Sequence, residues 1–170
     1  MRTLMLMRHA KSSWDQPELD DLDRPLAARG QEAAPLIARY MKTKLQPDLV
    51  LCSPAARVRE TWQLMTPVLG RTVDCKTLRT IYPGAPSRLL EALRRAAAEV
   101  GTLMLIGHNP GLGRLATGLC GSGPKKPLER MRSKFPTAAL AVIDFDVDRW
   151  DQVAPGAGRL RAFLRPKDLA

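Results

Sequence analysis

Uninterrupted runs of hydrophobic residues mark the expected sheet. Residues 3–7 read TLMLM, residues 102–106 read TLMLI, and the run DLVLC at 48–52 is similar. A strand that is covered on both faces needs such a run, because neither of its faces meets water. We therefore expect three central strands at these positions. A weaker strand is expected at 77–79, and two final strands are expected at 139–145 and 159–164.

Hydrophobic residues at helical spacing fill most of the segments between these runs. Pro35 lies inside the first helical segment, where it would kink the helix or delay its start. Ser53 and Pro54 predict the start of the second helix, with serine as the cap and proline at the first helical position. The expected helices span 26–45, 54–69, 86–101 and 112–119. Residues 121–136, which are rich in Gly, Pro and Lys, are expected to be irregular.

The order of these elements favours an α/β fold. Strands that alternate with helices form layers around a sheet whose central strands are parallel. The last two strands have no helix between them, so we expect them to form an antiparallel edge of the sheet. The chain has 170 residues and shows no internal repeat or linker, which indicates a single domain over residues 1–170.

Composition limits the classes of function. The net charge is +10, from 27 basic and 17 acidic residues. A basic surface is typical of nucleic-acid binding, but aromatic residues make up only 5% and no recognised nucleic-acid module is present. Solvated helix faces would also account for the charge, as would a positive cleft that attracts anionic substrates. The low aromatic content and the missing module argue against a nucleic-acid partner. The sequence shows no membrane span and no secretory signal, so we expect a cytoplasmic protein that does not bind membranes.

Neither the cysteines nor the acidic residues predict a metal site. The three cysteines are widely spaced and form no CxxC pair, which argues against zinc and against a disulfide framework. The acidic cluster at 20–23 is interpreted as a solvated loop with helix-capping carboxylates, and Arg29 is expected to pair with one of these acids. The basic run at 125–134 is interpreted as solvent-exposed charge. The alternative is a rim that attracts an acidic protein surface.

Residues suited to phosphate chemistry follow each of the three central strands. Arg8 and His9 come directly after the first strand, Ser53 and Arg57 come after the second, and His108 comes after the third. The carboxyl ends of parallel strands meet at one edge of an open α/β sheet, and ligands bind there. Both histidines of the chain are therefore expected at one mouth, together with two arginines.

These residue types predict phosphoryl transfer. The planar guanidinium group of arginine offers paired donors that match two phosphoryl oxygens. Histidine attacks as an uncharged nucleophile near neutral pH and forms a reversible N–P bond. We expect the two arginines to disfavour protonation of His9, which keeps its attacking lone pair free. Transition-state charge would be held by Arg8, Arg57 and, if it is protonated, His108.

Three motifs resemble those of a known family. The stretch LMLMRHAKSSW, at 4–14, resembles the signature of the histidine phosphatase superfamily around its nucleophilic histidine. SPAARVRET, at 53–61, is similar to the second motif of that superfamily, and IGHNPG, at 106–111, resembles its third. Within the superfamily, the short chain and the sequence DRPL at 23–26 are most similar to the SixA-type phosphohistidine phosphatases.

The resemblance implies a fold, a set of site residues and an activity. The implied fold is a phosphoglycerate mutase-like, three-layer α/β/α sandwich around a mostly parallel mixed sheet. The implied site consists of the nucleophile His9 and the phosphate-binding residues Arg8, Arg57 and His108. We also expect Ser12 and Asp15, in the loop after His9, to bind substrate. No metal or organic cofactor is implied. The implied enzyme is a metal-independent phosphatase that acts on phosphohistidine of a carrier or phosphotransfer protein.

Departures from the superfamily pattern leave the proton donor open. Ala10 replaces the usual glycine after the nucleophile, so the turn there should not need a positive φ. Asp15 stands where mutase relatives carry an asparagine, and the stretch 77–90 has no acid before Glu91 to match the proton donor of larger relatives. We nominate Asp15 as the substitute acid. The alternatives are a small-molecule phosphomonoesterase of the same fold and a non-catalytic binder of phosphorylated proteins.

Overall fold

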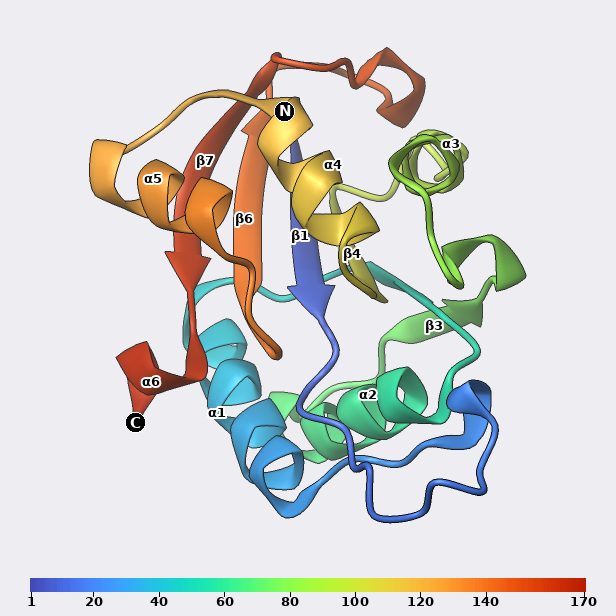
Figure 1. Ribbon diagram of the computed structural model, residues 1–170. Coiled ribbons are helices and arrows are strands. Elements are labelled where there is room, and N and C mark those ends of the chain that lie inside the picture. Colours follow the sequence, from blue (N-terminus) through green and yellow to red (C-terminus); the bar gives the residue numbers. More distant parts are fainter.

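The computed structural model describes residues 1–170 and contains one sheet of seven strands, in the order β3-β2-β4-β1-β6-β7-β5 (Figure 1). The strands are β1 (Arg2–Arg8), β2 (Leu49–Cys52), β3 (Asp74–Thr77), β4 (Thr102–Gly107), β5 (Cys120–Ser122), β6 (Leu140–Phe145) and β7 (Gly158–Leu164). The first four strands are parallel to one another, and β5 is parallel to β7. Only β6 is antiparallel to its neighbours, β1 and β7, so the expected mostly parallel mixed sheet is confirmed.

Helices cover both faces of the sheet. The helices are α1 (Ala28–Lys44), α2 (Ala56–Leu69), α3 (Pro86–Arg94), α4 (Gly111–Leu119), α5 (Lys125–Ser133) and the short α6 (Pro166–Leu169). Buried residues of α1 and α2 belong to one hydrophobic cluster, and those of α3, α4 and α5 belong to another. The sheet lies between these two clusters (Figure 1). This arrangement confirms the three-layer α/β/α sandwich.

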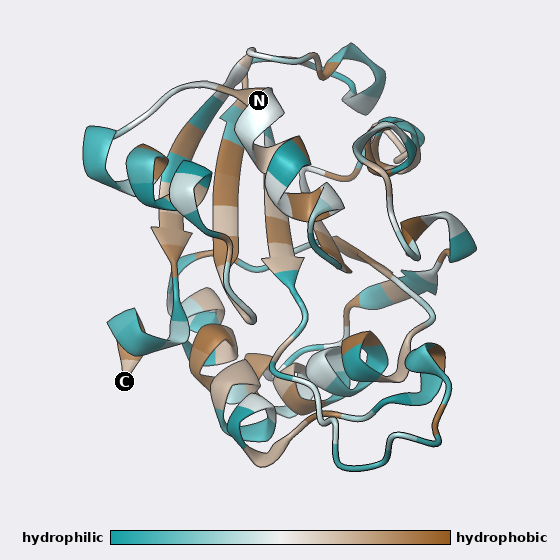
Figure 2. Ribbon diagram, viewed as in Figure 1, coloured by the Kyte–Doolittle hydropathy of each residue, from teal (hydrophilic) through white to brown (hydrophobic).

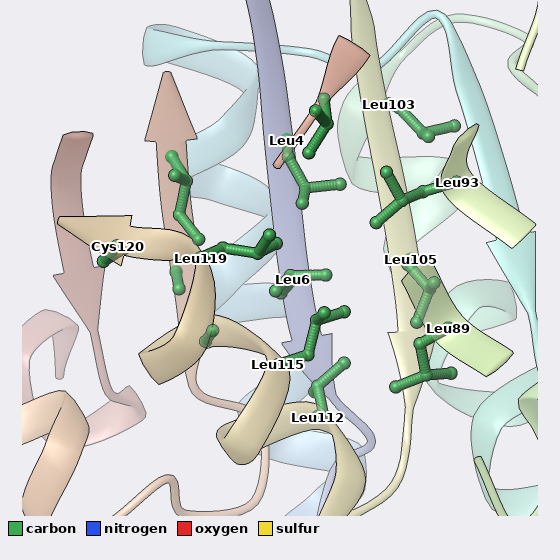
Figure 3. Packing of buried hydrophobic residues seen from close by; sticks show 14 of the residues in the cluster. Leu4, Leu6, Leu89, Leu93, Leu103, Leu105, Leu112, Leu115, Leu119 and Cys120 are labelled. Atoms are coloured by element: carbon green, nitrogen blue, oxygen red, sulfur yellow. The ribbon is translucent and has the colours of Figure 1, made fainter. Parts of the chain in front are cut away.

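The central strand β1 shows how the hydrophobic run builds both layers. Successive side chains of a strand point to opposite faces, so Leu4 and Leu6 join the cluster with α3 and α4, while Met5 and Met7 join the cluster with α1 and α2. Figure 3 shows the leucines of β1 beside those of α4 and β4. All four side chains are fully buried, and each contributes about 1.5–3 kcal/mol of burial free energy. Figure 2 shows that the central strands are mostly hydrophobic, whereas helix α5 is mostly hydrophilic.

Several expected boundaries are wrong. Helix α2 begins at Ala56, and its N-cap residue Ala55 makes no side-chain capping bond. Ser53 therefore does not cap the helix, and Pro54 is not its first residue. Helix α1 begins at Ala28 and runs through Pro35. The third helix ends at Arg94 rather than at residue 101, and β3 lies at 74–77 rather than at 77–79.

The segment expected to be irregular, residues 121–136, contains regular structure. It includes most of β5 and all of α5, which buries Leu128 and Met131 against the second cluster. Strand β5 pairs with the outer side of β7. The last two strands are antiparallel as expected, but they do not form the edge of the sheet, because β5 lies beyond them. None of the helices has the length and apolar character that a membrane span requires.

Candidate active site

The three central strands bring the predicted residues to one edge of the sheet. Strand β4 lies between β1 and β2, and Arg8 is paired with Gly107 in the parallel register. Beyond the last paired residues, the His9 amide donates to the Gly107 carbonyl at 3.1 Å, and the Ser53 amide donates to the Ile106 carbonyl at 3.3 Å. The chain segments that carry the two histidines and Ser53 therefore leave the sheet side by side.

His9 is buried, and its hydrogen bonds define which ring nitrogen carries the proton. Its Nδ1 lies 2.7 Å from the carbonyl oxygen of Ala10, which only accepts, so Nδ1 carries the hydrogen. Its Nε2 accepts from Nε of Arg57 at 3.3 Å. Burial, with smaller contributions from His108 and the two arginines, lowers the pKa of His9 to about 3, although the hydrogen bond to Ala10 opposes this shift. His9 is therefore uncharged, as expected, but burial contributes more than the arginines do.

His108 lies against His9 and is also uncharged near neutral pH. The two ring centroids are 5.2 Å apart. Its Nδ1 lies 3.4 Å from Nη2 of Arg57, which only donates, and its Nε2 lies 2.7 Å from Oγ of Ser53. Burial, followed by the charge of Arg57, lowers the pKa of His108 to about 4. We expect His108 to hold transition-state charge only in its protonated form. In the free protein near neutral pH, His108 is not protonated.

Arg57 is the residue that connects the parts of the site. It is the second residue of α2, and its side chain is 6% exposed. Besides the two histidines, it contacts Asp21, with Nη1 donating to the backbone carbonyl at 2.6 Å and Nη2 donating to Oδ2 at 3.0 Å. Thr61 lies one turn later on α2, accepts from the Ala10 amide at 3.0 Å, and so fixes the loop after the nucleophile.

Asp21 is the residue that the sequence did not identify. Its carboxylate accepts from Tyr82 at 2.6 Å and from Nε of Arg24 at 3.1 Å, in addition to Arg57. The hydrogen bond from Tyr82, followed by those from the two arginines, holds the pKa of Asp21 well below its usual range. The expected solvated position is confirmed, because the Asp21 side chain is 46% exposed, but the expected helix-capping role is wrong, because no side-chain capping bond is present. Arg29 forms no ion pair with this acidic cluster, so that expected pairing is also wrong.

Arg8 carries a buried donor that has no acceptor in the protein. Its Nη1 donates to the Phe135 carbonyl at 3.1 Å, whereas its buried Nε has no acceptor in the protein. Burial and the charge of Arg57 lower the pKa of Arg8, which reflects how close the two guanidinium groups lie. A buried donor without an acceptor is costly unless something binds it. An anion between the two arginines would supply that acceptor.

Ser12 and Asp15 do not join this group. The hydroxyl of Ser12 is buried and accepts from Nη1 of Arg24 at 2.9 Å, so it helps to hold the loop. Trp14 stacks against the guanidinium of Arg24, with 3.5 Å between the guanidinium carbon and the ring centroid. The Asp15 carboxylate is exposed and forms no hydrogen bond or ion pair. The substrate-binding roles of Ser12 and Asp15 stay predictions, without contacts to His9.

The backbone after the nucleophile has an ordinary conformation, with negative φ at Ala10. Ala138 is the only non-glycine residue with positive φ. Position 10 therefore does not require the glycine of the usual motif. No group of three or more His, Cys, Asp or Glu side chains lies in an arrangement that would hold a metal ion.

Comparisons with known proteins agree with the motifs. The histidine phosphatase superfamily (branch 1) matches residues 4–82. An uncharacterized protein of Mycobacterium tuberculosis is 35% identical over 95% of this chain and 100% of its own length. A crystal structure of the "putative phosphohistidine phosphatase SixA from Agrobacterium tumefaciens" is 31% identical, covers 97% of this chain and 98% of its own, and has a TM-score of 0.82. The tungstate complex of the protein histidine phosphatase SixA shares the fold, with 24% identity over 99% of both chains and a TM-score of 0.79. The chain therefore belongs to the histidine phosphatase superfamily, as a phosphatase of the SixA type.

Proposed function

We propose that the protein hydrolyses phosphohistidine on another protein, with His9 as the covalent nucleophile. The observation that supports this proposal most directly is the state of His9. Its Nδ1 hydrogen is bonded to Ala10, its Nε2 lone pair faces Arg57, and its pKa of about 3 keeps the ring uncharged. We call Arg8, His9, Arg57 and His108 the phosphate pocket.

The reaction follows from this geometry in two steps. Nε2 of His9 attacks phosphorus, the N–P bond of the substrate breaks, and its electron pair passes to the leaving imidazole nitrogen. Water then attacks phosphorus and gives up a proton to solvent, the N–P bond to His9 breaks, and its electron pair returns to Nε2 as inorganic phosphate is released. Arg8 and Arg57 hold the phosphoryl oxygens through both steps, and an arginine in such a position contributes about 10³–10⁵ in rate. No step requires a metal ion.

The acids near the site favour a leaving group that needs little protonation. Asp21 is the carboxylate that contacts the phosphate pocket, through Arg57. Its hydrogen bonds with Tyr82 and two arginines keep it ionised. Glu91 pairs with Arg88 on α3 and with Arg95 directly after it, and it forms no ion pair with the arginines of the phosphate pocket. An alkoxide leaves poorly without a strong general acid, whereas a phosphohistidine nitrogen takes its proton from solvent. This supports phosphohistidine over alkyl esters such as phosphoserine.

A small-molecule phosphomonoesterase is the second candidate, because the same pocket would accept activated aryl phosphates. A non-catalytic phosphoprotein binder is disfavoured, because such a protein has no need of an uncharged, oriented His9. Release of phosphate from a phosphohistidine protein, from p-nitrophenyl phosphate and from phosphoserine distinguishes the candidates. We expect the first two to react and phosphoserine to react poorly. Rapid turnover of phosphoserine would favour the phosphomonoesterase.

The covalent step has its own test. Reactions with ³²P-labelled phosphohistidine protein, stopped in alkali, should leave an acid-labile label on the enzyme, and peptide mapping should locate it at His9. His9→Ala should keep its melting temperature and lose the label together with turnover. EDTA should leave the wild type unaffected. Full activity of His9→Ala would exclude the covalent mechanism, and loss of activity with EDTA that a divalent ion restores would indicate a metallophosphatase.

A further inference from the structure

A second positively charged site lies beside the phosphate pocket. A cavity of about 610 Å³ opens between the first half of α1, the end of α5 with the loop that follows it, and α6. Lys11, in the loop after the nucleophile, also lines it. Six basic side chains surround this cavity, which we call the basic pocket: Lys11, Arg29, Arg130, Lys134, Arg165 and Lys167.

Most of these cations are not neutralised within the protein. Only Arg165 forms an ion pair, with Asp168. The other five form no salt bridge, and the two glutamates that line the cavity, Glu32 and Glu129, form none either. Five unpaired positive side chains against two glutamates around one concave surface produce a locally positive potential that attracts anions.

The walls of the basic pocket are also the supports of the nucleophile. Lys11 follows His9 by two residues, its carbonyl accepts from the Ala27 amide at 2.9 Å, and α1 packs so closely that a Cβ on Gly30 would clash with it. On the opposite side, the loop after α5 continues to Ala138, whose amide bonds to the carbonyls of Arg8 and His9 at 3.0 Å. A ligand in the basic pocket therefore lies next to the backbone that positions His9.

The arrangement of the cations matches several charges spread over a segment of chain. They come from four separate parts of the protein, and Lys11, Arg29, Arg130, Lys134 and Lys167 are exposed. No buried donor converges on one point, as it does in the phosphate pocket. The cavity has the size of sites that hold whole ligands, about 300–1,000 Å³, which is far more than one phosphate needs. Ala33, Leu36 and two prolines in its wall suit the apolar parts of a peptide.

We propose that the basic pocket binds an acidic segment that adjoins the phosphohistidine of the protein substrate. This proposal rests on the function proposed above and adds the recognition of the partner to it. The phosphohistidine side chain reaches into the phosphate pocket, while glutamate or aspartate residues beside it in the substrate contact the basic pocket. Such contacts raise the rate of association and the affinity and weaken with added salt, while the chemical step is unchanged.

A pair of charge-reversed variants tests the proposal. Arg29→Glu with Lys134→Glu changes two walls of the basic pocket, and neither residue makes a side-chain hydrogen bond or ion pair. Lys125→Glu with Lys126→Glu makes the same change in net charge at the start of α5, outside the cavity. Melting temperatures should show that both variants fold.

Synthetic phosphohistidine peptides provide the substrates, one flanked on both sides by glutamates and the other by glutamines. We expect the wild type to prefer the glutamate peptide by about tenfold in kcat/KM at low salt, mainly through KM. The Arg29/Lys134 variant should lose this preference, the Lys125/Lys126 variant should keep it, and p-nitrophenyl phosphate should react equally with all three. The absence of a preference in the wild type, or its equal loss in both variants, would overturn the proposal.

A binding experiment separates this proposal from the proposed function. Fluorescence anisotropy with the unphosphorylated glutamate peptide, at 20 and 200 mM salt, measures the basic pocket without any turnover. Binding that Arg29→Glu with Lys134→Glu abolishes supports the pocket, even if the wild type fails to hydrolyse phosphohistidine. Binding that this variant retains overturns it. A single-stranded DNA oligonucleotide of equal charge that binds more tightly, and loses binding in the same variant, would overturn the assignment to a protein partner.

Discussion

The phosphate pocket and the basic pocket both present positive side chains beside the loop after β1, but they differ in burial and bonding. Arg57 is 6% exposed and donates hydrogen bonds to His9, Asp21 and His108. The cations of the basic pocket are mostly exposed and unpaired. A guanidinium group that is held from several sides has one geometry, and this suits the in-line displacement of a phosphoryl group. Exposed, unpaired lysines and arginines attract negative charge without fixing its position.

Because the two pockets differ in burial and bonding, they should tolerate different substitutions. In the phosphate pocket, geometry matters as much as charge, because the donors have to meet specific oxygens. In the basic pocket, the sum of the charges matters, because each pair near the surface contributes only about 0–1 kcal/mol. Exchanges of arginine for lysine, which preserve charge and change shape, should therefore affect the two sites unequally.

The largest effect should come from Arg57→Lys. Lysine keeps the charge but loses the planar fork, so kcat/KM for p-nitrophenyl phosphate should fall by at least about tenfold. Arg29→Lys, in the basic pocket, is the matched control and should change this value by less than about twofold. Steady-state kinetics on both variants and on the wild type would measure the effect. An equal loss in both variants would contradict the distinction between the two pockets.

A smaller effect is expected from Asp21→Asn. With its carbonyl and its carboxylate, Asp21 occupies two donors of Arg57 that a phosphoryl group requires, so it competes with the substrate. Asparagine lacks the charge, and inorganic phosphate should then inhibit at about fivefold lower concentration, a change of about 1 kcal/mol. Asp23→Asn is the control, because Asp23 lies two residues away, is exposed and forms no side-chain hydrogen bond or ion pair. Similar inhibition constants for both variants would show that Asp21 does not compete.

A third prediction concerns the pH dependence of stability rather than activity. The chain has only two histidines, so an NMR titration reports His9 and His108 without interference, and we expect pKa values of about 3 and 4. Both values lie below the ordinary value near 6.5, so the unfolded chain binds more protons as the pH falls below 6.5. The free energy of unfolding should therefore decrease as the pH is lowered from 6.5 to 4. Titration of either histidine near 6.5 would contradict its buried, uncharged state.

The sequence predicted the parts of the fold that rest on strong local patterns. Strands β1, β2 and β4 were found because strands buried on both faces need uninterrupted apolar runs. Helix α5 was missed because Gly121, Gly123 and Pro124 indicate a turn, and because only Leu128 and Met131 of the helix are buried. Two apolar positions are too few to show a helical period.

The site was predicted as far as its residues follow the strands directly. The structure brings Arg8, His9, Arg57 and His108 together, whereas their catalytic roles stay predictions, as do the cytoplasmic location and the single domain. Asp21 lies 36 residues from Arg57, and no local pattern reveals such a contact. Ser53 has the position of a helix cap, but its hydroxyl contacts His108, because α2 begins three residues later. Long-range contacts decided both cases.

The bond between Asp21 and Arg57 also has a consequence for the end of the catalytic cycle. Asp21 is attached to the enzyme by the loop that Arg24 and Trp14 hold, so it never diffuses away from the pocket. A tethered group returns as if it were present at millimolar or higher concentration, on the order of what short flexible linkers provide. When hydrolysis leaves inorganic phosphate between the arginines, the returning carboxylate takes back its place on Arg57. Departure of the product is then favoured by the return of the Asp21 carboxylate to Arg57.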